Sequence, residues 1–487
     1  MRLTLLHFND VHGRLDQFPR LFALINRERA EARAASRQVL VLDGGDSSDR
    51  NFWESDITKG RANFTLLEAM GVHASVVGNG EALQWGRNAL ATLVAGAHFP
   101  VLAANLVDLH DPTQLAVPGL KASHVFDLDG FKVGVVGVTA VYRNGYDRFG
   151  YQTLDPQPIL EREVSALKAQ GVNFILLLSH LGYATPEEKQ TWANPNDFTD
   201  DLAARACPEI GVIVGGHSHV ALERPVTVGE TLIVQASDKG RSLGRLDVEV
   251  EAATGRVIDY AGRLIPCDEQ TPIDPTVSSV LELVREEAAR LLDAPIGATR
   301  RDLPHAIDQP SAFSNLIADA LREVCQADLA IFFSGFARRG LKIGPITRRD
   351  LYDALPGSAH VTAAEVSGAQ IMRLVERMLL SPWRTAPLNP HRAEPPLGLP
   401  AHSRNVRLLY DLNPKPHLLR CWVNNNPIDP ARRYRLASTY TTLNDVTDDP
   451  EYDYIGIQPW QKVEMVRVED VLWEIVEDWV KKNSPIV

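Results

Sequence analysis

Hydrophobic runs and amphipathic stretches alternate along the first half of the chain, from Leu3 to about Pro266. Short apolar runs bounded by Gly, Asn or Pro are typical of buried strands, and a repeat near 3.6 residues is typical of helices. Strands are predicted at Leu3–Phe8, Val39–Leu42, Ala74–Val77, Pro100–Ala104, Phe174–Leu178 and Val212–Val214. Helices are predicted at Pro19–Ala34, Asn63–Met70, Ala89–Ala97 and Ile159–Gln170. This alternation predicts a layered α/β domain.

Two further segments alternate in the manner of β-hairpins. Residues 126–139 turn at Asp129-Gly130, and residues 246–264 turn at Thr254-Gly255. Asp-Gly and Gly-containing turns between apolar runs favour such hairpins. They add antiparallel pairing to the sheets of the first domain.

A helix follows the first domain and is predicted to connect it to a second one. It opens at Asp274-Pro275, a capping residue followed by proline, and runs to about Leu292. Val277, Leu281, Val284 and Leu291 lie on one face of it. The expected division is a first domain over residues 1–268, a linker over 269–296 and a second α/β domain over 297–487, with an irregular proline-rich loop at 381–400.

Polar side chains follow five of the predicted strands. Each has a plain explanation alone, because Asn and Gly form turns and His is often at the surface. The recurrence points to a common site, since ligands gather at the carboxyl ends of strands in open α/β sheets. These candidate metal ligands are Asp10, His12, Asp46, Asn79, His180, His217 and His219.

Seven nitrogen and oxygen donors exceed the four that close a structural zinc site. They suit two divalent ions about 3.5–4 Å apart that share a carboxylate, an arrangement used for phosphoester hydrolysis. The mixture of imidazole and oxygen favours Mn, with Zn, Fe or Co as alternatives, over Ca or Mg. Neighbouring glycines would allow the backbone to crowd around the ions.

Composition narrows the class of protein. The chain has 487 residues, 45% of them hydrophobic, and a formal charge of −12, which argues against a binder of nucleic-acid polymers or of membrane surfaces. Four separated cysteines are expected to be isolated core thiols. The sequence starts directly with a strand, which predicts a cytoplasmic protein if Met1 is the natural start. Oligomeric state is left open.

The five strand-end motifs, in this order, resemble those of the calcineurin-like metallophosphoesterases. More narrowly, the chain resembles the two-domain 5′-nucleotidase family, which includes UDP-sugar hydrolases and 2′,3′-cyclic-nucleotide phosphodiesterases. The resemblance implies a four-layer sandwich domain joined by a helix to a smaller α/β substrate-binding domain. It also implies one metal on Asp10, His12 and His219, a second on Asn79, His180 and His217, and Asp46 as the bridge. Asp10, Asp46 and Asn79 are then the candidate catalytic residues, with a bridging hydroxide that attacks phosphorus.

One departure from the family concerns proton transfer. The family carries Gly-Asn-His-Glu followed two residues later by Asp, and that His and Asp form a dyad. Here Gly80 and Leu83 occupy their positions. Loss of a general acid typically costs about 10²–10⁴-fold in rate. His98 and His124 are candidate substitutes, whereas Glu81 is interpreted as a surface carboxylate.

A second departure concerns the substrate domain. Residues 313–320 resemble the family's Asn-x-x-x-Asp-Ala helix, and Arg338 falls on the family's substrate-binding arginine. Arg339 could add a second anion contact. The family's base-stacking aromatics are not matched, so aromatic rings elsewhere become candidates. The favoured alternative is that these rings are ordinary core or loop aromatics, which leaves open whether a base is recognised at all. Proposed substrate-binding residues are Arg338, Arg339, Phe333, Phe336 and Tyr440, with Tyr452 and Tyr454 as further aromatics.

These observations predict a metal-dependent phosphoric ester hydrolase that acts on a small-molecule phosphoester. The favoured substrates are nucleotides, either 5′-monophosphates or cyclic phosphodiesters. Hydrolysis of a phosphodiester with a stable alkoxide leaving group would lose least in rate without a general acid, if the second metal binds the leaving oxygen. The alternatives are a phosphorylated sugar or lipid head group, or a pseudoenzyme that binds metal and ligand without turnover.

Overall fold

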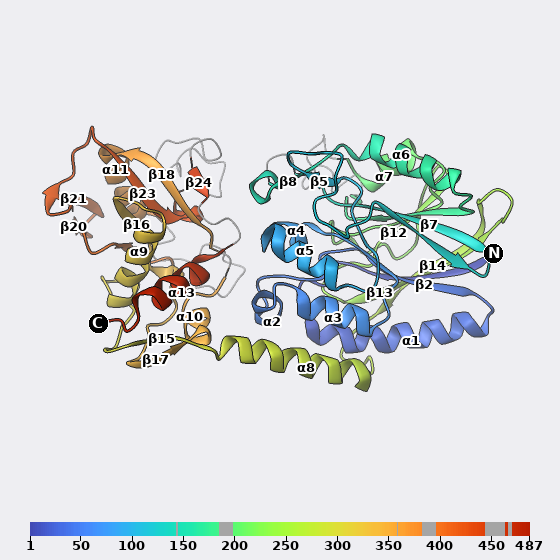
Figure 1. Ribbon diagram of the computed structural model, residues 1–487, viewed down its shortest axis with the longest axis horizontal. Helices are drawn as coiled ribbons and strands as arrows, with labels where there is room; N and C mark the ends of the chain where they lie inside the picture. The colour runs from blue at the N-terminus through green and yellow to red at the C-terminus, as the bar shows by residue number, and fades with distance from the viewer. Residues whose placement is uncertain (143–144, 185–197, 358, 382–395, 444–462, 466–469) are drawn as a thin grey trace. The chain divides into compact units, whose positions relative to one another are not determined.

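The computed structural model describes residues 1–142, 145–184, 198–357, 359–381, 396–443, 463–465 and 470–487. The chain forms two compact units, Met1–Ala289 and Arg290–Val487. Each unit has an α/β architecture with its own sheets and helices (Figure 1). Among the described residues, no helix is long and apolar enough to cross a membrane.

The first unit contains two six-stranded sheets. In the first, β1 to β4 run parallel and β13 and β14 add an antiparallel hairpin beside β1. Its order is β14 (Val257–Pro266), β13 (Ser242–Val250), β1 (Arg2–Phe8), β2 (Gln38–Asp43), β3 (Ala74–Val76) and β4 (Val101–Leu102).

The second sheet of this unit is also mixed. Strands β7, β9, β10 and β12 run parallel, and an antiparallel strand closes each edge. Its order is β11 (Val226–Val228), β12 (Thr231–Val234), β10 (Val212–Val214), β9 (Phe174–Ser179), β7 (Phe131–Val138) and β6 (Ser123–Leu128). A short pair, β5 (Leu106–Asp108) and β8 (Tyr151–Thr153), lies outside both sheets.

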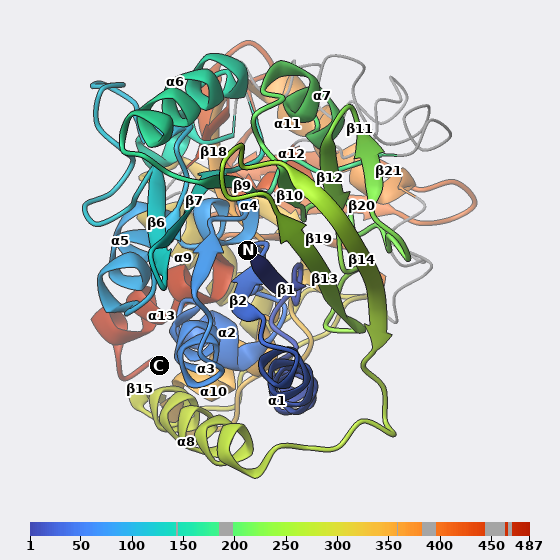
Figure 2. The ribbon, with the colours of Figure 1, turned by 90° about the vertical axis from the view of Figure 1, so that its right-hand side faces the viewer.

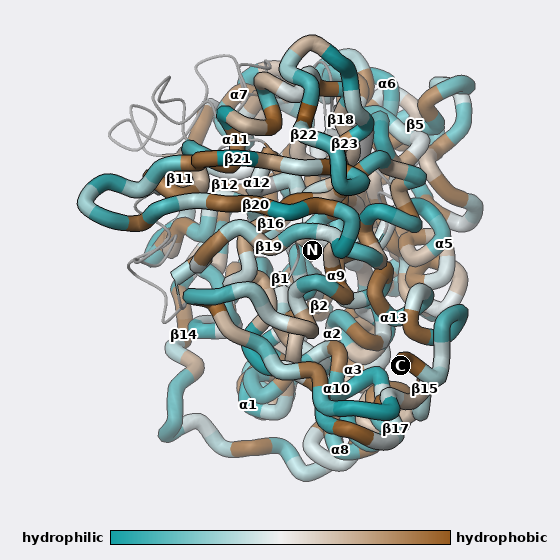
Figure 3. The backbone as a smooth tube through the Cα atoms, turned by 90° about the vertical axis from the view of Figure 1, so that its left-hand side faces the viewer, coloured by the Kyte–Doolittle hydropathy of each residue, from teal (hydrophilic) through white to brown (hydrophobic). Residues whose placement is uncertain are grey.

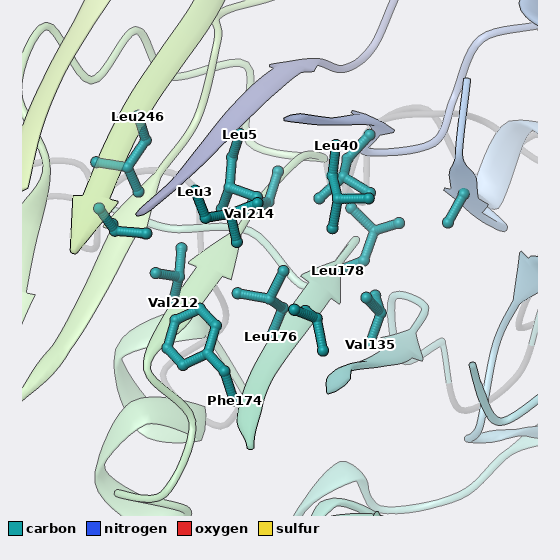
Figure 4. Close-up of a cluster of buried hydrophobic side chains, with 14 of the residues drawn as sticks. Leu3, Leu5, Leu40, Val135, Phe174, Leu176, Leu178, Val212, Val214 and Leu246 are labelled. Atoms are coloured by element: carbon teal, nitrogen blue, oxygen red, sulfur yellow. The ribbon is translucent and has the colours of Figure 1, made fainter. Parts of the chain in front are cut away.

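Leucine, valine and phenylalanine side chains from the inner faces of both sheets form one core. Leu5 and Leu40 of the first sheet lie close to Leu176 and Val214 of the second (Figure 4). Helices cover the outer faces, which gives a four-layer helix–sheet–sheet–helix sandwich (Figure 2). The larger covering helices are α1 (Phe18–Ala34), α3 (Arg61–Ala69), α5 (Gly86–Gly96), α6 (Pro156–Ala169) and α7 (Asp200–Ala206).

Short helices complete the first unit. They follow the strands of the first sheet or precede β8, and they are η1 (Leu15–Gln17), α2 (Trp53–Ile57), α4 (Asn79–Leu83) and η2 (Asp147–Phe149).

The strands, helices and both hairpins predicted for this unit are present, but two strands are shorter than predicted. Strand β3 ends at Val76, one residue before the predicted end. Strand β4 covers Val101–Leu102 instead of Pro100–Ala104. Pro100 has no amide hydrogen to contribute to a sheet. The amides of Ala103 and Ala104 instead donate to the carbonyls of Lys121 and Gly137, which lie outside the neighbouring strand β3.

The predicted connecting helix is α8 (Pro275–Leu292). Asp274 caps it, because its Oδ1 accepts hydrogen bonds from the amides of Thr276 and Val277 at 2.8 and 3.2 Å. Leu281 and Val284 on the predicted face are buried. The boundary between the two compact units falls within this helix, after Ala289.

The second unit is built on a five-stranded sheet with the order β19-β16-β23-β18-β24. Helix α11 packs on this sheet through a core that also receives side chains from the hairpin β20–β21. The turn of that hairpin, residues 412–416, is hydrophilic apart from Leu412, which packs against the same core (Figure 3). A two-stranded ladder of β15 and β17 stands apart.

The strands of the second unit are β15 (Pro295–Thr299), β16 (Leu329–Phe333), β17 (Gly344–Thr347), β18 (Val361–Ser367), β19 (Pro400–His402), β20 (Val406–Asp411), β21 (His417–Val423), β22 (Asn426–Pro427), β23 (Arg433–Thr439) and β24 (Val463–Met465). Its helices are α9 (Ala312–Val324), η4 (Ser334–Phe336), α10 (Arg348–Ala354), α11 (Gly368–Leu380), α12 (Tyr440–Leu443) and α13 (Leu472–Asn483).

Two further expectations can be compared with the fold. All four cysteines are free and buried, which confirms that they are core thiols. Most of the predicted proline-rich loop, residues 382–395, lies outside the described residues.

Candidate metal centre

Five strands of the first unit end at one place. Strands β1, β2 and β3 of the first sheet deliver Asp10, His12, Asp46 and Asn79, and strands β9 and β10 of the second sheet deliver His180, His217 and His219. Backbone hydrogen bonds continue past the ends of β1 and β2, from the amide of Asp10 to the carbonyl of Gly45 and from the amide of His12 to that of Asp46, both at 2.9 Å. The first two loops are therefore fixed to each other.

Asp10, His12 and His219 form what we call the outer group. The Nε2 atoms of His12 and His219 lie 3.0 Å apart. Asp10 Oδ1 lies 3.7 Å from the first of these nitrogens and 3.5 Å from the second. The side chains of His12 and His219 are 19% and 41% exposed, so this group borders solvent.

Asp46, Asn79, His180 and His217 form what we call the inner group. His180 Nε2 lies 3.4 Å from Asp46 Oδ2 and 3.3 Å from Asn79 Oδ1. The rings of His180 and His217 have centroids 5.1 Å apart. Asp46 Oδ2 also lies 4.0 Å from His12 Nε2, which places this carboxylate between the two groups.

Asp10 shows that the cluster suits a cation. Its Oδ2 accepts hydrogen bonds from Asn9 Nδ2 at 2.6 Å and from the amide of His217 at 2.9 Å. Its Oδ1 is buried and has no hydrogen-bond partner among the described residues. Because an unpartnered buried carboxylate oxygen is costly, and because imidazole nitrogens face it from both groups, the donor set fits divalent metal ions.

The backbone at this site is strained. Asp10, His12, Asp46, His217 and His219 all have φ between +50° and +73°. Residues other than glycine adopt this region rarely, and each instance costs on the order of 1–3 kcal/mol. Such strain tends to accumulate at functional sites, and here it turns consecutive side chains toward one point.

Glycines allow the strand ends to approach, as the sequence predicts. A Cβ at Gly78 would lie 2.1 Å from Asp46 Oδ1, and one at Gly216 would lie 2.5 Å from the carbonyl oxygen of Gly44. Any side chain at these two positions would separate the loops that carry the candidate ligands.

Electrostatics favours positive charge in the cluster. Burial lowers the pKa of His180, but the carboxylates of Asp46 and Asp10 outweigh burial and raise this pKa to about 10. Burial raises the pKa of Asp46, yet His180 and His12 bring it below its ordinary value. Burial together with His180 lowers the pKa of His217 to about 4, which leaves this imidazole neutral and able to act as a ligand.

Glu81 is not a surface carboxylate, and that prediction is wrong. Its side chain is buried and accepts hydrogen bonds from the amides of Asp46, Ser48 and Gly78 at 3.0–3.1 Å and from Ser48 Oγ at 2.7 Å. It joins the loops after β2 and β3. The capping pattern at the start of α4 was a signal for this role, because a Glu at the third helical position accepts from the N-cap amide.

Asn9 is a second residue that the sequence analysis missed. It is buried, it donates to Asp10 Oδ2, and its Oδ1 accepts from the amide of Ala236 at 2.8 Å. It therefore holds one oxygen of Asp10 and directs the other toward the imidazoles. Its place at the end of β1 suggested only a turn.

Gly80, at the position of the family's missing imidazole, is tightly surrounded. A Cβ at Gly80 would lie 3.0 Å from Asp46 Oδ1, 3.2 Å from the carbonyl of Ser48 and 3.3 Å from Gln84 Nε2. The amide of Gly80 donates to Asp46 Oδ1 at 2.6 Å. The backbone of Gly80 thus contacts the carboxylate of Asp46 in place of a side chain.

The proposed substitute acids lie elsewhere. His98 is exposed and faces Glu68 at 3.1 Å, and the ring of His124 packs edge-on against Phe126. Both histidines border a cavity of about 480 Å³ whose lining includes none of the seven candidate ligands. Neither histidine is placed to protonate a leaving group at the cluster.

The candidate substrate residues of the second unit differ in surroundings. Arg338 is exposed and its guanidinium donates to the carbonyl of Gly335. Arg339 is also exposed and faces two carboxylates, Asp350 and Asp353, at 3.5 and 3.2 Å. An anion at Arg339 would therefore compete with these acids.

The aromatic candidates are only partly available. Phe333 is fully buried in the core of the second unit, so its ring offers no face to a base. The prediction that it stacks on a base is wrong, and the alternative, an ordinary core aromatic, is confirmed for this residue. Phe336 packs partly buried against the same core, and Tyr440 is 39% exposed at the start of α12. Tyr452 and Tyr454 lie outside the described residues.

Comparison with known proteins agrees with this architecture. Residues 3–221 match the calcineurin-like phosphoesterase family, and residues 289–446 match the 5′-nucleotidase C-terminal domain. The uncharacterized metallophosphoesterase YunD of Bacillus subtilis is 28% identical over 376 residues, 77% of each chain. The 5′-nucleotidase of Vibrio cholerae serotype O1 is 27% identical over 426 residues, 76% of this chain and 74% of its own.

A solved structure extends the likeness to the whole fold. The 5′-nucleotidase precursor of Thermus thermophilus has a TM-score of 0.53 and 24% sequence identity, and the match covers 100% of this chain and 97% of that one.

Proposed function

Because this chain belongs to the calcineurin-like phosphoesterases and carries a 5′-nucleotidase C-terminal domain, we propose that it is a two-metal hydrolase of nucleotide phosphoesters. Asp10, His12 and His219 would hold one divalent ion. Asn79, His180 and His217 would hold the other, and Asp46 would bridge. Such a pair of ions polarises phosphoryl oxygens and makes water a nucleophile near neutral pH.

The observation that carries this proposal is the buried, unpartnered Oδ1 of Asp10 between the outer and inner groups of the described structure. The residues around it keep the donors in place. Asn9 fixes the other oxygen of Asp10, the amide of Gly80 fixes Oδ1 of Asp46, and Glu81 fixes the loops that carry Asp46 and Asn79. Little rearrangement is then needed when substrate binds.

The lack of a side chain at Gly80 bears on the type of ester. No described side chain stands there to protonate a leaving oxygen. A phosphodiester whose leaving alkoxide is stable, and would be taken up by one of the ions, loses least in rate under these conditions. This favours phosphodiesters, such as 2′,3′-cyclic nucleotides, over nucleoside 5′-monophosphates. The exposed guanidinium of Arg338 is the candidate contact for the anionic substrate.

The test is a steady-state comparison with Mn²⁺ as the supplied metal. We expect kcat/KM for bis(p-nitrophenyl) phosphate to exceed that for p-nitrophenyl phosphate, and 2′,3′-cyclic AMP to be hydrolysed faster than 5′-AMP. A wide preference for the monoesters would contradict the diester proposal. Turnover of aryl esters without turnover of any nucleotide would instead indicate a sugar or lipid phosphoester. Two bound ions without hydrolysis would indicate a binding protein.

A further inference from the structure

The two imidazoles of the outer group have the same orientation. His12 and His219 point their Nε2 atoms at each other and at Asp10 Oδ1. Their Nδ1 atoms therefore face away from the cluster. A cation held between the Nε2 atoms requires the ring proton of each histidine to sit on Nδ1.

A carboxylate faces each of these Nδ1 atoms. Asp49 Oδ2 lies 3.5 Å from Nδ1 of His12, and Asp238 Oδ2 lies 3.6 Å from Nδ1 of His219. The Asp49 carboxylate is itself fixed, because its Oδ1 accepts from the amide and from Nδ2 of Asn51, both at 2.8 Å.

Asp238 is held in a comparable way. Its side chain is almost fully buried, and it contacts Lys239 Nζ at 3.0 Å and the guanidinium of Arg241. The amide of Lys239 donates to the carbonyl of Asp10 at 2.6 Å, which ties this loop to the outer group.

The imidazole of His180 in the inner group has a different partner. Its Nδ1 lies 2.7 Å from the carbonyl oxygen of Gly44, and its Nε2 faces Asp46 and Asn79. A backbone carbonyl orients this ring, so its tautomer does not depend on a carboxylate side chain. His180 therefore differs from the two histidines of the outer group both in exposure and in what orients its ring.

We propose that Asp49 and Asp238 are positioning residues that orient His12 and His219 for the ion of the outer group, while the ion of the inner group is independent of them. This inference rests on the proposed function, because it assigns supporting residues to the same pair of ions. A carboxylate behind a ligating histidine fixes its tautomer and strengthens it as a donor, and its removal typically weakens metal binding about 10–100-fold.

The experiment measures metal binding in the full-length chain. Wild type, Asp49→Asn and Asp238→Asn are stripped with a chelator and titrated calorimetrically with Mn²⁺, and bound manganese is counted after gel filtration. We expect two tight ions in the wild type. Each variant should keep one tight ion and bind the second about 10–100-fold more weakly. Electron paramagnetic resonance should show the coupled-pair signal in wild type and an isolated-ion signal in the variants at limiting Mn²⁺.

Asp247→Asn is the matched control. The side chain of Asp247 is 16% exposed, as that of Asp49 is, and it pairs with Arg245 as Asp238 pairs with Arg241. Its hydrogen bonds and ion pairs in the described structure go to Thr4 and Arg245, so its variant should bind both ions normally. Thermal melting of the metal-free proteins checks that each variant folds. Asp49→Asn and Asp238→Asn each replace a carboxylate by an amide of the same shape, and each tests a different histidine of the outer group.

The outcomes separate this inference from the proposed function. If wild type binds no ion, the proposed function fails. If wild type binds two ions and both Asn variants do so with unchanged affinity, Asp49 and Asp238 have no positioning role. Equal weakening of both ions in a folded variant would also overturn the inference, because the inner group would then share the same support.

Discussion

Gly80 lies against the carboxylate of Asp46 and donates its amide to it, so we expect a larger residue there to disturb the candidate metal centre instead of restoring the family's dyad. In Gly80→His, the new Cβ would meet Asp46 Oδ1 at 3.0 Å and the Ser48 carbonyl at 3.2 Å. We expect weaker Mn²⁺ binding and a fall in kcat of about 10-fold or more, since a small displacement of a positioned group is costly. Metal titration and steady-state kinetics measure both.

Gly96→Ala is the control for this substitution, because a Cβ at Gly96 meets no atom of the described residues within 4 Å. It should leave metal binding unchanged. A rise in phosphomonoester activity in Gly80→His would contradict the prediction and show that the loop can accept an imidazole.

At this scale the seven candidate ligands could be proposed from sequence because each closely follows an apolar strand. Their supporting residues could be predicted only in part. The capping pattern indicates that Glu81 accepts from the amide of Gly78, but not that it also accepts from amides of the loop after β2. The contacts of Asp49 and Asp238 are with imidazoles in other loops, which no local pattern encodes. The proposal that Phe333 contacts substrate was wrong because the sequence does not show whether a helix covers an aromatic ring.

At the scale of elements, Glu81 connects the turn after β2 to the start of α4. Glu81→Gln keeps the shape but places an amide NH₂ among backbone donors. Hydrogen bonds to a charged group contribute about 1.5–3 kcal/mol, so we expect a loss of about 2–4 kcal/mol in the free energy of unfolding. Urea unfolding of the stripped protein measures this loss.

Glu68→Gln serves as the comparison, because Glu68 is partly exposed and its carboxylate faces the exposed His98. That variant should change stability by less than about 0.5 kcal/mol. Equal stability of Glu81→Gln and wild type would show that the two loops are held by other contacts.

Strand β1 carries a buried imidazole whose titration should be visible in stability. Burial lowers the pKa of His7 to about 4 from an ordinary value of 6.5. Between these two pH values the unfolded chain binds a proton at His7 that the folded chain does not bind. The free energy of unfolding therefore decreases as pH falls from 6.5 toward 4. From about pH 7 to about pH 5, we expect His7 to lower the free energy of unfolding by about 2 kcal/mol.

His7→Leu removes that contribution, so the difference in unfolding free energy between about pH 7 and pH 5 should shrink by this amount. Urea unfolding with chelator present gives both values, and other titrating groups cancel in the comparison. The same slope in His7→Leu and wild type would contradict the assignment.

The elements themselves followed closely from the pattern of apolar residues, and the exceptions have local causes. Strand β4 is short because the amides that follow it donate to Lys121 and to Gly137 of β7, which no local pattern encodes. The start of α8 was predicted correctly because Asp274 and Pro275 act within their own turn.

At the scale of the whole molecule, the first unit contains every candidate metal ligand and its own hydrophobic cores. Residues 1–292, which end with α8, should therefore fold alone and bind two Mn²⁺ ions. Such a fragment should hydrolyse bis(p-nitrophenyl) phosphate within about 10-fold of the full chain, because that chemistry needs only the metal centre. Circular dichroism, manganese counting and the colorimetric assay test these three expectations.

Removal of the second unit should impair nucleotide hydrolysis more than aryl diester hydrolysis, because the exposed Arg338 belongs to the second unit. We expect kcat/KM of the fragment for 2′,3′-cyclic AMP to fall about 100-fold, or about 2.7 kcal/mol in transition-state binding. Arg338→Ala in the full chain should reproduce part of this loss and spare the aryl diester. If the fragment retained full nucleotide activity, recognition would lie in the metal-binding unit itself, and the second unit would need another role.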